Sequence, residues 1–506
     1  MRMDPATMVF MSFFGLSAVS VFIGRSMRTR SLRATWVTLA HLPGYYSVYV
    51  VWSGVAKAQD YVLRLSPLGV KGLMAADPFS SFMALVAVFG SHMTMLYAAM
   101  VVEDTDSFAR FTAAGLAGTG AVIATLYSIN LAAMAILWEA TVAAQTGIIL
   151  LGRGEHVIEA AVKTAAMALL SSLLLATGLG MLFVSLEPTG VTLNLFTIPW
   201  VASHIPLAYQ GSGTLILISF AFILASFGIE IGAAPFYMWL PDMYTGSRPE
   251  AVALVVTTVD LGGMYLMARV TGMYAHLPVA RVPALGGLTP ILLAVVILSL
   301  FSMSLGELSA LGQSKIRRVL SYSSVADAGY VLLLSTYFFW GGTVPYGRTA
   351  FAAQALAYFV VTSNLSIAAA VACAGYLERR LQGMDLDSFR GAARLYPLAS
   401  VLLALSLLSL FGVPPMAGFI AKFLVVSALV TAPFPAMLGV AAVATVFFVV
   451  SAAYGMRIIG ACAATVEREV QPVQRDIAPL MPVLLIVIFL IVVGVNPGLL
   501  LSIFAG

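Results

Sequence analysis

The chain has 506 residues, of which 61% are hydrophobic and 9% are charged, with a formal net charge of +4 and a mean hydropathy of +0.99. Soluble domains carry roughly 25% charged residues, so this composition excludes a soluble protein and indicates a single bundle of membrane-spanning helices. The positive charge does not indicate nucleic acid, because membrane proteins concentrate Lys and Arg in their cytoplasmic loops.

Membrane-spanning helices are predicted along the whole chain. A span needs about 20 mostly apolar residues, and that length divides the sequence into about fourteen segments. The first is a retained helix, since its apolar stretch is too long for a signal-peptide core and has no cleavage pattern. Prolines break the seventh and twelfth segments, at Pro235 and at Pro414 and Pro415. In chain order the segments cover residues 6–24, 35–55, 78–101, 110–128, 131–152, 160–186, 213–240, 249–274, 287–311, 317–338, 351–377, 396–430, 435–461 and 479–503.

The loops between these segments differ in charge. With both termini outside, the inner loops hold most of the Lys and Arg residues, and the long outer loop 187–212 holds none. This asymmetry follows the positive-inside rule and favours an even number of crossings of a prokaryotic-type plasma membrane, with both termini on the outer side. The inner set is Arg25, Arg28, Arg30, Arg33, Arg110, Arg153, Arg248, Lys315, Arg317, Arg318, Arg379, Arg380, Arg390, Arg394, Arg468 and Arg475, and the outer set is Arg2, Lys57, Arg64, Lys71, Arg281 and Arg348.

The predicted fold is an all-α integral membrane bundle over residues 1–503. A proline-broken segment with a charge occurs near 230–241 and again near 412–422, five segments later. Two inverted five-helix repeats are a known plan for transporters, and an odd number of crossings per repeat gives the two halves opposite topology. The predicted division is 1–105 for the first three helices, 108–274 for the first half, 287–461 for the second half and 479–503 for the last helix.

Six ionisable side chains lie inside, or at the edge of, long apolar runs. A charge at bilayer depth is costly, so it is expected to face a partner, a cavity or an ion path. Broken segments with a nearby charge are also the best sequence pointer to a transport site. The sequence therefore predicts a route for protons or cations formed by Glu139, Lys163, Glu230, Asp260, Asp327 and Lys422.

Each of these residues also has a structural interpretation. Glu139 is either a coupling carboxylate or half of a static salt bridge. Lys163 is either its buried partner or a side chain that reaches the cytoplasmic surface. Lys422 has no loop within easy reach, which favours a functional role.

The other three carboxylates lie beside features that admit water. Glu230 precedes Pro235, which removes a backbone donor and frees a carbonyl near residue 231. Residues with hydroxyl groups precede both Asp260 and Asp327, which suits a hydrated file for protons. The alternative for each carboxylate is a static hydrogen bond to the backbone.

The remaining polar residues are interpreted as structural. Arg269, Glu307 and Arg457 lie near segment ends and are predicted to reach the interface. Cys373 and Cys462 are predicted to be buried packing residues, because no ligand spacing surrounds them. No motif for a phosphate, a dinucleotide, a flavin, a haem or an iron–sulfur cluster occurs, so no cofactor is predicted. No metal site is predicted either, because the histidines are scattered without ligand spacing: His41, His92, His156, His204 and His276.

Four stretches together resemble the antiporter-like proton-channel subunits of the respiratory complex I superfamily. They are WLPD at 239–242 with Tyr244 and Gly246, LGQSKIRRVLSYSS at 311–324, DSFRG at 387–391 and GVPPMAGFIAKF at 412–423. Their order and spacing match the family. Their detail is most similar to the subunit N type, whereas Trp138 and Glu139 look more like the subunit M type.

The resemblance implies two inverted half-channels with a central row of charged residues. It implies an ion pair of Glu139 with Lys163 near a neighbouring subunit, and an exit role for Lys422. The family has lysine at the seventh-helix and eighth-helix positions and histidine in the tenth helix, where this chain has acidic residues, namely Glu230, Asp260 and Asp327. The charge logic is then reversed, because an empty site is negative and a loaded site is neutral.

The function implied is that of a membrane-arm subunit in a redox-driven ion pump, with no redox or catalytic centre of its own. The enzyme would be a translocating quinone reductase with an NADH-, ferredoxin- or deazaflavin-type donor, and the partners would be other membrane-arm subunits, lipid and protons. Three alternatives stay open. The acidic row could bind Na⁺, since hard oxygen ligands suit a hard cation. The chain could instead belong to a multisubunit Na⁺/H⁺ antiporter or a membrane-bound hydrogenase, or it could be a scaffold that does not pump.

Overall fold

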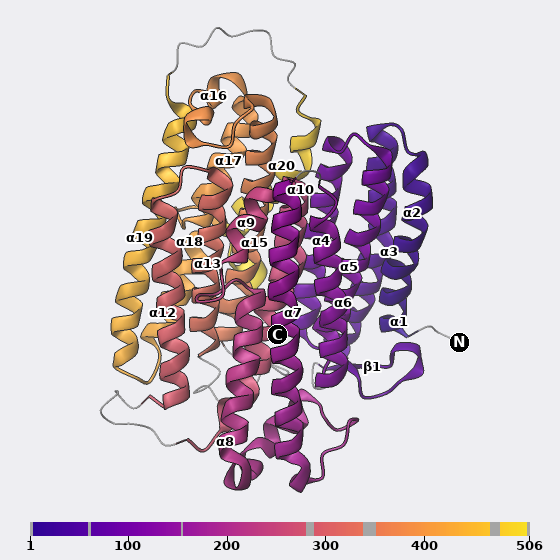
Figure 1. Ribbon diagram of the computed structural model, residues 1–506, viewed down its shortest axis with the longest axis vertical. Coiled ribbons are helices and arrows are strands. Elements are labelled where there is room, and N and C mark those ends of the chain that lie inside the picture. The colour runs from indigo at the N-terminus through magenta and orange to yellow at the C-terminus, as the bar shows by residue number, and fades with distance from the viewer. Residues whose placement is uncertain are drawn as a thin grey trace.

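The computed structural model describes residues 4–58, 62–152, 155–279, 288–336, 351–465 and 476–502. Within these ranges the chain is almost entirely helical, and the long helices run side by side along one axis (Figure 1). Eleven of the described helices are long and apolar enough to cross a membrane. The sheet found in these ranges is the antiparallel hairpin of β1 (Leu63–Leu65) and β2 (Met74–Ala76).

The first helices form one side of the bundle. The segments α1 (Pro5–Phe10), a π-helical turn (Met11–Gly15) and α2 (Leu16–Ser26) follow one another in place of the predicted span 6–24. They are followed by α3 (Arg30–Lys57), which packs against α1 and α4 (Pro78–Val101). A capping box starts α4, because the Ser80 N–H donates to Asp77 Oδ1 at 2.7 Å and the Asp77 N–H donates to Ser80 Oγ at 2.9 Å.

The middle of the chain contains one error of prediction. The predicted outer loop 187–212 is largely helical, because α8 begins at Ile198 and bends at Ser212, whose φ of −131° is not helical. Pro199, Pro206 and the polar residues near the bend interrupt the apolar run, so its length did not reveal a helix. The elements here are α5 (Thr105–Tyr127), α6 (Leu131–Ile149), α7 (Glu155–Leu186), α8 (Ile198–Glu230), α9 (Trp239–Gly246), α10 (Pro249–Val255), a π-helical turn (Val256–Asp260) and α11 (Leu261–Thr271).

The last part of the chain agrees closely with the predicted segments. The proline-broken segment 396–430 consists of two short helices, and the thiols of Cys373 and Cys462 are buried and free, as predicted. Residues 287, 338 and 503, which bound predicted segments, lie outside the described residues, as do Arg2, Arg153, Arg281, Arg348, Arg468 and Arg475. The helices are α12 (Pro290–Leu311), α13 (Ile316–Ser335), α15 (Phe351–Leu381), α16 (Ala392–Leu395), α17 (Pro397–Leu410), α18 (Ala417–Val430), α19 (Ala436–Ala463), α20 (Met481–Val495) and α21 (Gly498–Leu501).

The two broken segments end their first helices in the same way. Gly232 after α8 and Gly412 after α17 have φ values of +67° and +75°, a conformation that glycine adopts without strain. Each glycine N–H bonds to the carbonyl three residues back, at 3.1 Å and 3.0 Å, and the next N–H bonds to the carbonyl five residues back, at 2.8 Å and 2.9 Å. This Schellman geometry satisfies the last carbonyls of both helices.

A second feature also occurs twice. Asn130, between α5 and α6, pairs antiparallel with Thr197 before α8, and Lys315, between α12 and α13, pairs with Asp385 upstream of α17. In both places the short connection between two helices is thus hydrogen-bonded to the residues that precede a proline-broken segment, α8 in the first case and α17 in the second. The start of α8 lies toward the lower end of the bundle in Figure 1, whereas α16, just before α17, lies at the upper end.

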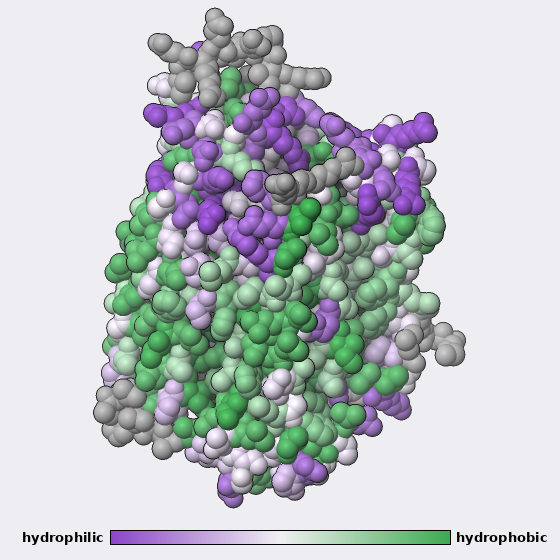
Figure 2. Space-filling model, viewed as in Figure 1, coloured by the Kyte–Doolittle hydropathy of each residue, from purple (hydrophilic) through white to green (hydrophobic). Residues whose placement is uncertain are grey.

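The surface has a broad apolar belt. Figure 2 shows hydrophobic residues over the middle of the molecule and hydrophilic residues gathered at the end that carries α16. Large apolar side chains on the outside, such as Phe22, Ile136 and Val449, are 69% to 75% exposed. An exposed apolar surface of this kind fits a lipid environment.

Candidate functional site

Glu230 is the last residue of α8, at the first helix break, and only 5% of it is exposed. Its Oε1 has no hydrogen-bond partner among the described residues. Among the described residues no donor bonds to the carbonyl of Ile231, in line with the freed carbonyl expected near that position, whereas the Ile229 carbonyl accepts from Trp239 Nε1 at 3.0 Å and from the Gly232 N–H at 3.1 Å. One oxygen of the Glu230 carboxylate is thus buried without a hydrogen bond in the described ranges, although Ser171 on α7 lies within reach of the group.

Asp260 closes the π-helical turn that joins α10 to α11, and it is 3% exposed. Neither carboxylate oxygen has a hydrogen-bond partner in the described part of the chain. The neighbouring hydroxyls of Thr257 and Thr258 donate to backbone carbonyls of their own helix, at 3.0 Å and 2.6 Å, and so do not form the expected file with Asp260. Single π-helical turns are frequent at functional sites.

Asp327 and Lys422 lie in the second half of the bundle. Asp327 is 4% exposed and accepts a hydrogen bond from Ser363 Oγ. Lys422 is 6% exposed; its Nζ donates to Ser451 Oγ at 2.8 Å and lies 4.8 Å from the centre of the Phe448 ring. Lys422 also lines an apolar pocket of about 420 Å³ between α18 and α19, which is open to the outside and bordered by the exposed Phe419 and Phe423. Lys422 is therefore buried next to the second helix break, as its apolar surroundings in the sequence predicted.

Glu307 on α12 is a buried acid that the sequence analysis assigned wrongly to the interface. It is 2% exposed, its Oε2 has no hydrogen-bond partner among the described residues, and the hydroxyls of Tyr330 and Tyr454 lie near it. The adjacent Gly306 gave a usable signal, since a Cβ there would lie 2.5 Å from the Ala326 backbone of α13. A glycine that allows such close packing marks the covered face of its helix.

Arg269 is a second correction. It is fully buried, and its Nη1 donates to Leu126 O at 2.9 Å and to Tyr265 Oη at 2.7 Å. Its Nη2 lies 3.6 Å from the carboxylate of Asp77. Arg269 therefore links α11 to the end of α5 and to the start of α4. Arg457, by contrast, is exposed and donates to Leu311 O at 2.6 Å, in agreement with the prediction.

The predicted ion pair of Glu139 with Lys163 is absent from the ion pairs of the described residues. Glu139 is exposed on α6 and accepts from Ser172 Oγ at 2.6 Å. Lys163 is 45% exposed rather than buried, and its Nζ lies 2.7 Å from Glu159 Oε1 and 2.6 Å from Asp242 Oδ2. Its long side chain thus follows α7 toward α9 instead of reaching α6.

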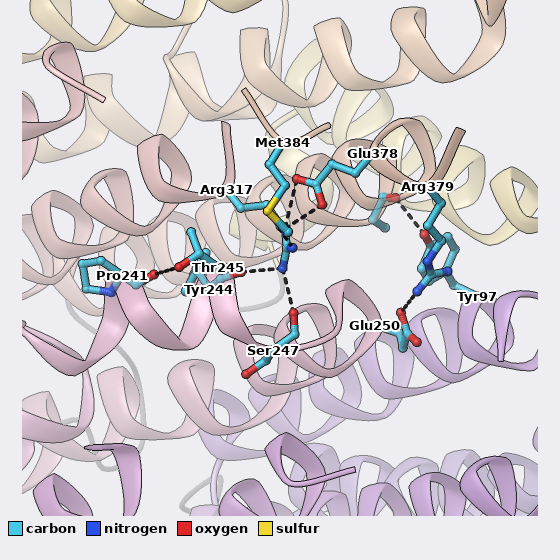
Figure 3. Close-up of polar contacts among 11 residues, drawn as sticks. Tyr97, Pro241, Tyr244, Thr245, Ser247, Glu250, Arg317, Glu378, Arg379 and Met384 are labelled. Atoms are coloured by element: carbon cyan, nitrogen blue, oxygen red, sulfur yellow. Dashed lines mark hydrogen bonds and ion pairs between the residues drawn. The ribbon is translucent and has the colours of Figure 1, made fainter. Parts of the chain in front are cut away.

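A buried arginine holds the end of α9, as Figure 3 shows. Arg317 on α13 pairs with Glu378 on α15, with Nε 2.9 Å from Oε2, and both side chains are at most 7% exposed. Arg317 Nη1 also donates to the carbonyls of Tyr244, at 2.6 Å, and Ser247, at 2.7 Å. A cation at the C-terminus of a helix is favourable because it neutralises the free carbonyls. This contact ties the first half of the bundle to the second.

Among the buried ionisable side chains of the described residues, two groups lie near the helix breaks. Glu230 and Asp260 form the group at the first break, and Glu307, Asp327 and Lys422 form the group at the second. Carboxylates without partners can take up a proton or bind a cation. No cluster of three or more His, Cys, Asp or Glu residues that could hold a metal ion occurs in the described ranges.

Comparison with known proteins agrees with this geometry. A family model described as "NADH:quinone oxidoreductase/Mrp antiporter, TM" matches residues 128–448. Subunit N of the NADH-quinone oxidoreductase of Coxiella burnetii is 27% identical over 85% of this chain and 84% of that protein. Subunit N 2 of Acidobacterium capsulatum is 33% identical over 55% of this chain and 53% of its own length, so about half of that relative is matched.

Two solved structures share the fold. The Mrp complex from Dietzia sp. contains a chain with a TM-score of 0.80 and 18% identity, and the alignment covers 99% of this chain and 96% of that one. Respiratory complex I from Thermus thermophilus with bound aureothin contains a chain with a TM-score of 0.74 and 23% identity, aligned over 98% of this chain and 100% of that one. On the family match and on this fold, the chain belongs to the NADH:quinone oxidoreductase/Mrp antiporter transmembrane family.

Proposed function

We propose that this chain is a membrane-arm subunit of a complex I-like redox-driven pump, and that it moves protons through its buried charged residues. The observation that carries the proposal is the burial of Glu230, Asp260, Asp327 and Lys422 at or beside helix breaks, with both carboxylate oxygens of Asp260 and one of Glu230 left without a hydrogen bond among the described residues. Burial without a partner is costly, so such groups point to a transport role. The chain holds no redox centre in this proposal, and the electrons pass through partner subunits.

The proposal includes the arrangement of the fold. We take about fourteen segments to span the bilayer, with residues 1–105 as the first three helices, 108–274 and 287–461 as inverted five-helix halves, and 479–503 as the last helix. The repeated Schellman turns at Gly232 and Gly412 support this division, as do the repeated pairings of Asn130 and Lys315. The offset that relates the two glycines also relates Asp242 to Lys422.

The acidic residues at these positions determine how the charge of each site changes when it takes up a proton. A carboxylate at Glu230, Asp260 or Asp327 is negative when empty and neutral when it holds a proton. Arrival of the proton therefore removes a buried charge, which lowers the cost of the loaded state in a low-dielectric interior. Lys422 has the opposite logic, because it is charged when loaded. The proton would pass from sites that become neutral to one that becomes positive.

The assembly and its location belong to the same proposal. The partners are other membrane-arm subunits, and the exposed Glu139 on α6 marks one face toward a neighbour. The complex would lie in a prokaryotic-type plasma membrane with both termini on the outer side. Protons are the proposed ion. Because hard oxygen ligands also suit Na⁺, transport of Na⁺ is the second candidate.

Proton translocation by single-residue variants of the assembled complex tests the proposal. Inverted vesicles would be assayed for acidification and for quinone reduction with Glu230→Gln, Asp260→Asn, Asp327→Asn or Lys422→Ala. We expect fewer protons per quinol in each variant. Pumping at the wild-type ratio in all four would leave only the scaffold role. Dependence on added Na⁺, with uptake of ²²Na⁺, would replace protons by Na⁺ as the transported ion.

A further inference from the structure

Two histidines that the sequence analysis treated as scattered lie together between α3 and α4. The imidazole rings of His41 and His92 are stacked, with centres 4.9 Å apart and an angle of 20° between their planes. His41 is fully buried and His92 is half-buried, and both lie near the middle of their helices. An ionisable group at this depth calls for an explanation.

The hydrogen bonds of His41 fix its tautomer. Nδ1 lies 2.8 Å from the carbonyl oxygen of Val37, which can only accept, so Nδ1 carries the hydrogen. Nε2 lies 3.1 Å from Ser91 Oγ and therefore accepts from that hydroxyl. Ser91 Oγ also lies 2.8 Å from Thr119 Oγ1 on α5, whose hydroxyl hydrogen is shared with the Gly115 carbonyl at 2.7 Å. A file of two hydroxyls thus leads from His41 into the bundle.

The hydrogen bonds of His92 point the other way, toward the outer face of α3. Thr38 Oγ1 donates to Ala34 O at 3.0 Å, so it accepts from His92 Nε2 at 3.4 Å. His92 Nδ1 then accepts from the Tyr45 hydroxyl at 3.3 Å. Thr38 and Tyr45 are only half-buried. The pair therefore connects a partly exposed polar edge with the interior.

The pair can hold one proton but not two. The residues that contact it come from α3, α4, α5 and the π-helical turn Met11–Gly15, from which Phe13 meets His41 edge-on, and the turn Val256–Asp260 packs against α4 and α5. The ionisable groups that these described elements turn toward the pair are the two imidazoles and Tyr45. No carboxylate among them balances a second positive charge, and two cations at this separation would repel strongly in a medium of low dielectric constant.

The pair lies next to the layer that carries Asp260. Gly90 precedes Ser91 on α4, and a Cβ added at Gly90 would lie 2.5 Å from Cβ of Thr257. Thr257 belongs to the π-helical turn that ends at Asp260, whose carboxylate oxygens have no partner in the described ranges. The backbone of α4 therefore touches the turn that presents this carboxylate, while the next two residues of α4 contact or form the histidine pair.

We propose that His41 and His92 form a shared one-proton site that supplies Asp260 from the α3–α4 face of the bundle. The site takes up one proton at its half-buried edge and gives one up toward the interior, where the Asp260 carboxylate becomes neutral. The rotatable hydroxyls of Tyr45 and Ser91 allow this, because each can reverse its hydrogen bond when the imidazole beside it is protonated. Delivery of the proton to Asp260 rests on the proposed function, whereas the proton-binding site at His41 and His92 does not.

Nitrogen-15 NMR of the histidine-labelled complex in lipid nanodiscs tests the site itself. His41→Gln and His92→Gln identify the two signals, since glutamine keeps a donor and an acceptor but cannot take up a proton in this pH range. We expect the pair to change from two neutral rings to one neutral ring and one imidazolium as the pH falls. Two rings that stay neutral over the whole pH range in which the complex pumps would overturn the proposal, as would two imidazolium rings.

Acidification of inverted vesicles tests the connection to Asp260. We expect both glutamine variants to acidify more slowly than the wild type, with a deficit that shrinks as the pH rises, because the wild-type pair is then empty and has no proton to deliver. His204→Gln is the matched control, since His204 stacks on Trp200 at the start of α8, away from both groups. A deficit that is the same at every pH indicates a structural role and would overturn the proposal.

The NMR titration and the vesicle assays together distinguish failure of this inference from failure of the proposed function. If Asp260→Asn stops pumping and both glutamine variants pump normally, the supply route is overturned and the proposed function stands. If Asp260→Asn pumps normally, the destination at Asp260 is overturned, and the NMR titration still decides whether the proton site exists. Assembly is checked on native gels, and His92→Gln carries the test if the fully buried His41→Gln does not assemble.

Discussion

Replacing Glu378 by Leu removes one partner of the most fully buried ion pair around α9. The guanidinium of Arg317 is then left with a positive charge in a site where its side chain is 3% exposed. Breaking a buried pair in this way costs about 3–5 kcal/mol, because the remaining charge is uncompensated. The carbonyls of Tyr244 and Ser247 still accept from Arg317 Nη1, so we expect a value near the lower end.

A double variant separates the ion pair from the other contacts of Arg317. Adding Arg317→Met to Glu378→Leu removes both charges, and replacement of a buried pair by apolar residues is often neutral or stabilising. The remaining loss comes from the two uncapped carbonyls, at about 1–3 kcal/mol for each. The double variant should therefore be far more stable than the sum of the two single variants predicts.

Unfolding of the purified chain in mixed lipid–SDS micelles, followed by the fluorescence of its 6 tryptophans, measures these differences. Asp387→Asn is the control, since its pair with Arg390 is 3.8 Å apart with side chains 91% and 58% exposed. Such surface pairs contribute little, so no measurable change is expected. Costs that add to within about 0.5 kcal/mol would refute a direct interaction between Arg317 and Glu378.

Two further predictions concern the second half of the bundle. Gly412→Ala should destabilise the chain by roughly 1–2 kcal/mol through the positive φ alone, and it should also displace Lys422, whose Cδ lies 2.7 Å from the added Cβ. We expect a loss of stability in the micelle assay together with slower pumping. Unchanged pumping would contradict the displacement of Lys422. Glu307→Gln should leave stability equal or higher, since an amide costs less to bury than a carboxylate, yet it should slow acidification of vesicles. A large loss of stability would contradict this and show that the charged form of Glu307 is stabilised by Lys422 of the same group.

Burial depth could be read from the sequence, but the direction of a side chain could not. The apolar runs around Glu230, Asp260, Asp327 and Lys422 predicted deep burial, and each is at most 6% exposed. Position along a helix fixes the depth in the membrane, and these runs are long enough to leave no polar surface within reach.

The errors came from residues whose surroundings depend on a neighbouring helix. Glu307 and Arg269 lie near helix ends, yet adjacent helices cover them. Lys163 bonds to Asp242, a residue far along the chain that α9 brings close. The helix over 198–212 was missed for a related reason, since its prolines and polar residues break the hydropathy signal while its backbone remains helical on both sides of Ser212.

The sequence by itself determined the membrane class, most of the helices and both helix breaks. Hydropathy, proline and glycine act through local chemistry, so a short window of residues is enough to reveal them. Only the tertiary structure decided which charged and polar groups meet, among them Arg317 with Glu378, Lys163 with Asp242, and His41 with His92. Such contacts depend on the rotation and packing of helices that are distant in the chain, which are set by the shape of the whole bundle rather than by any single segment.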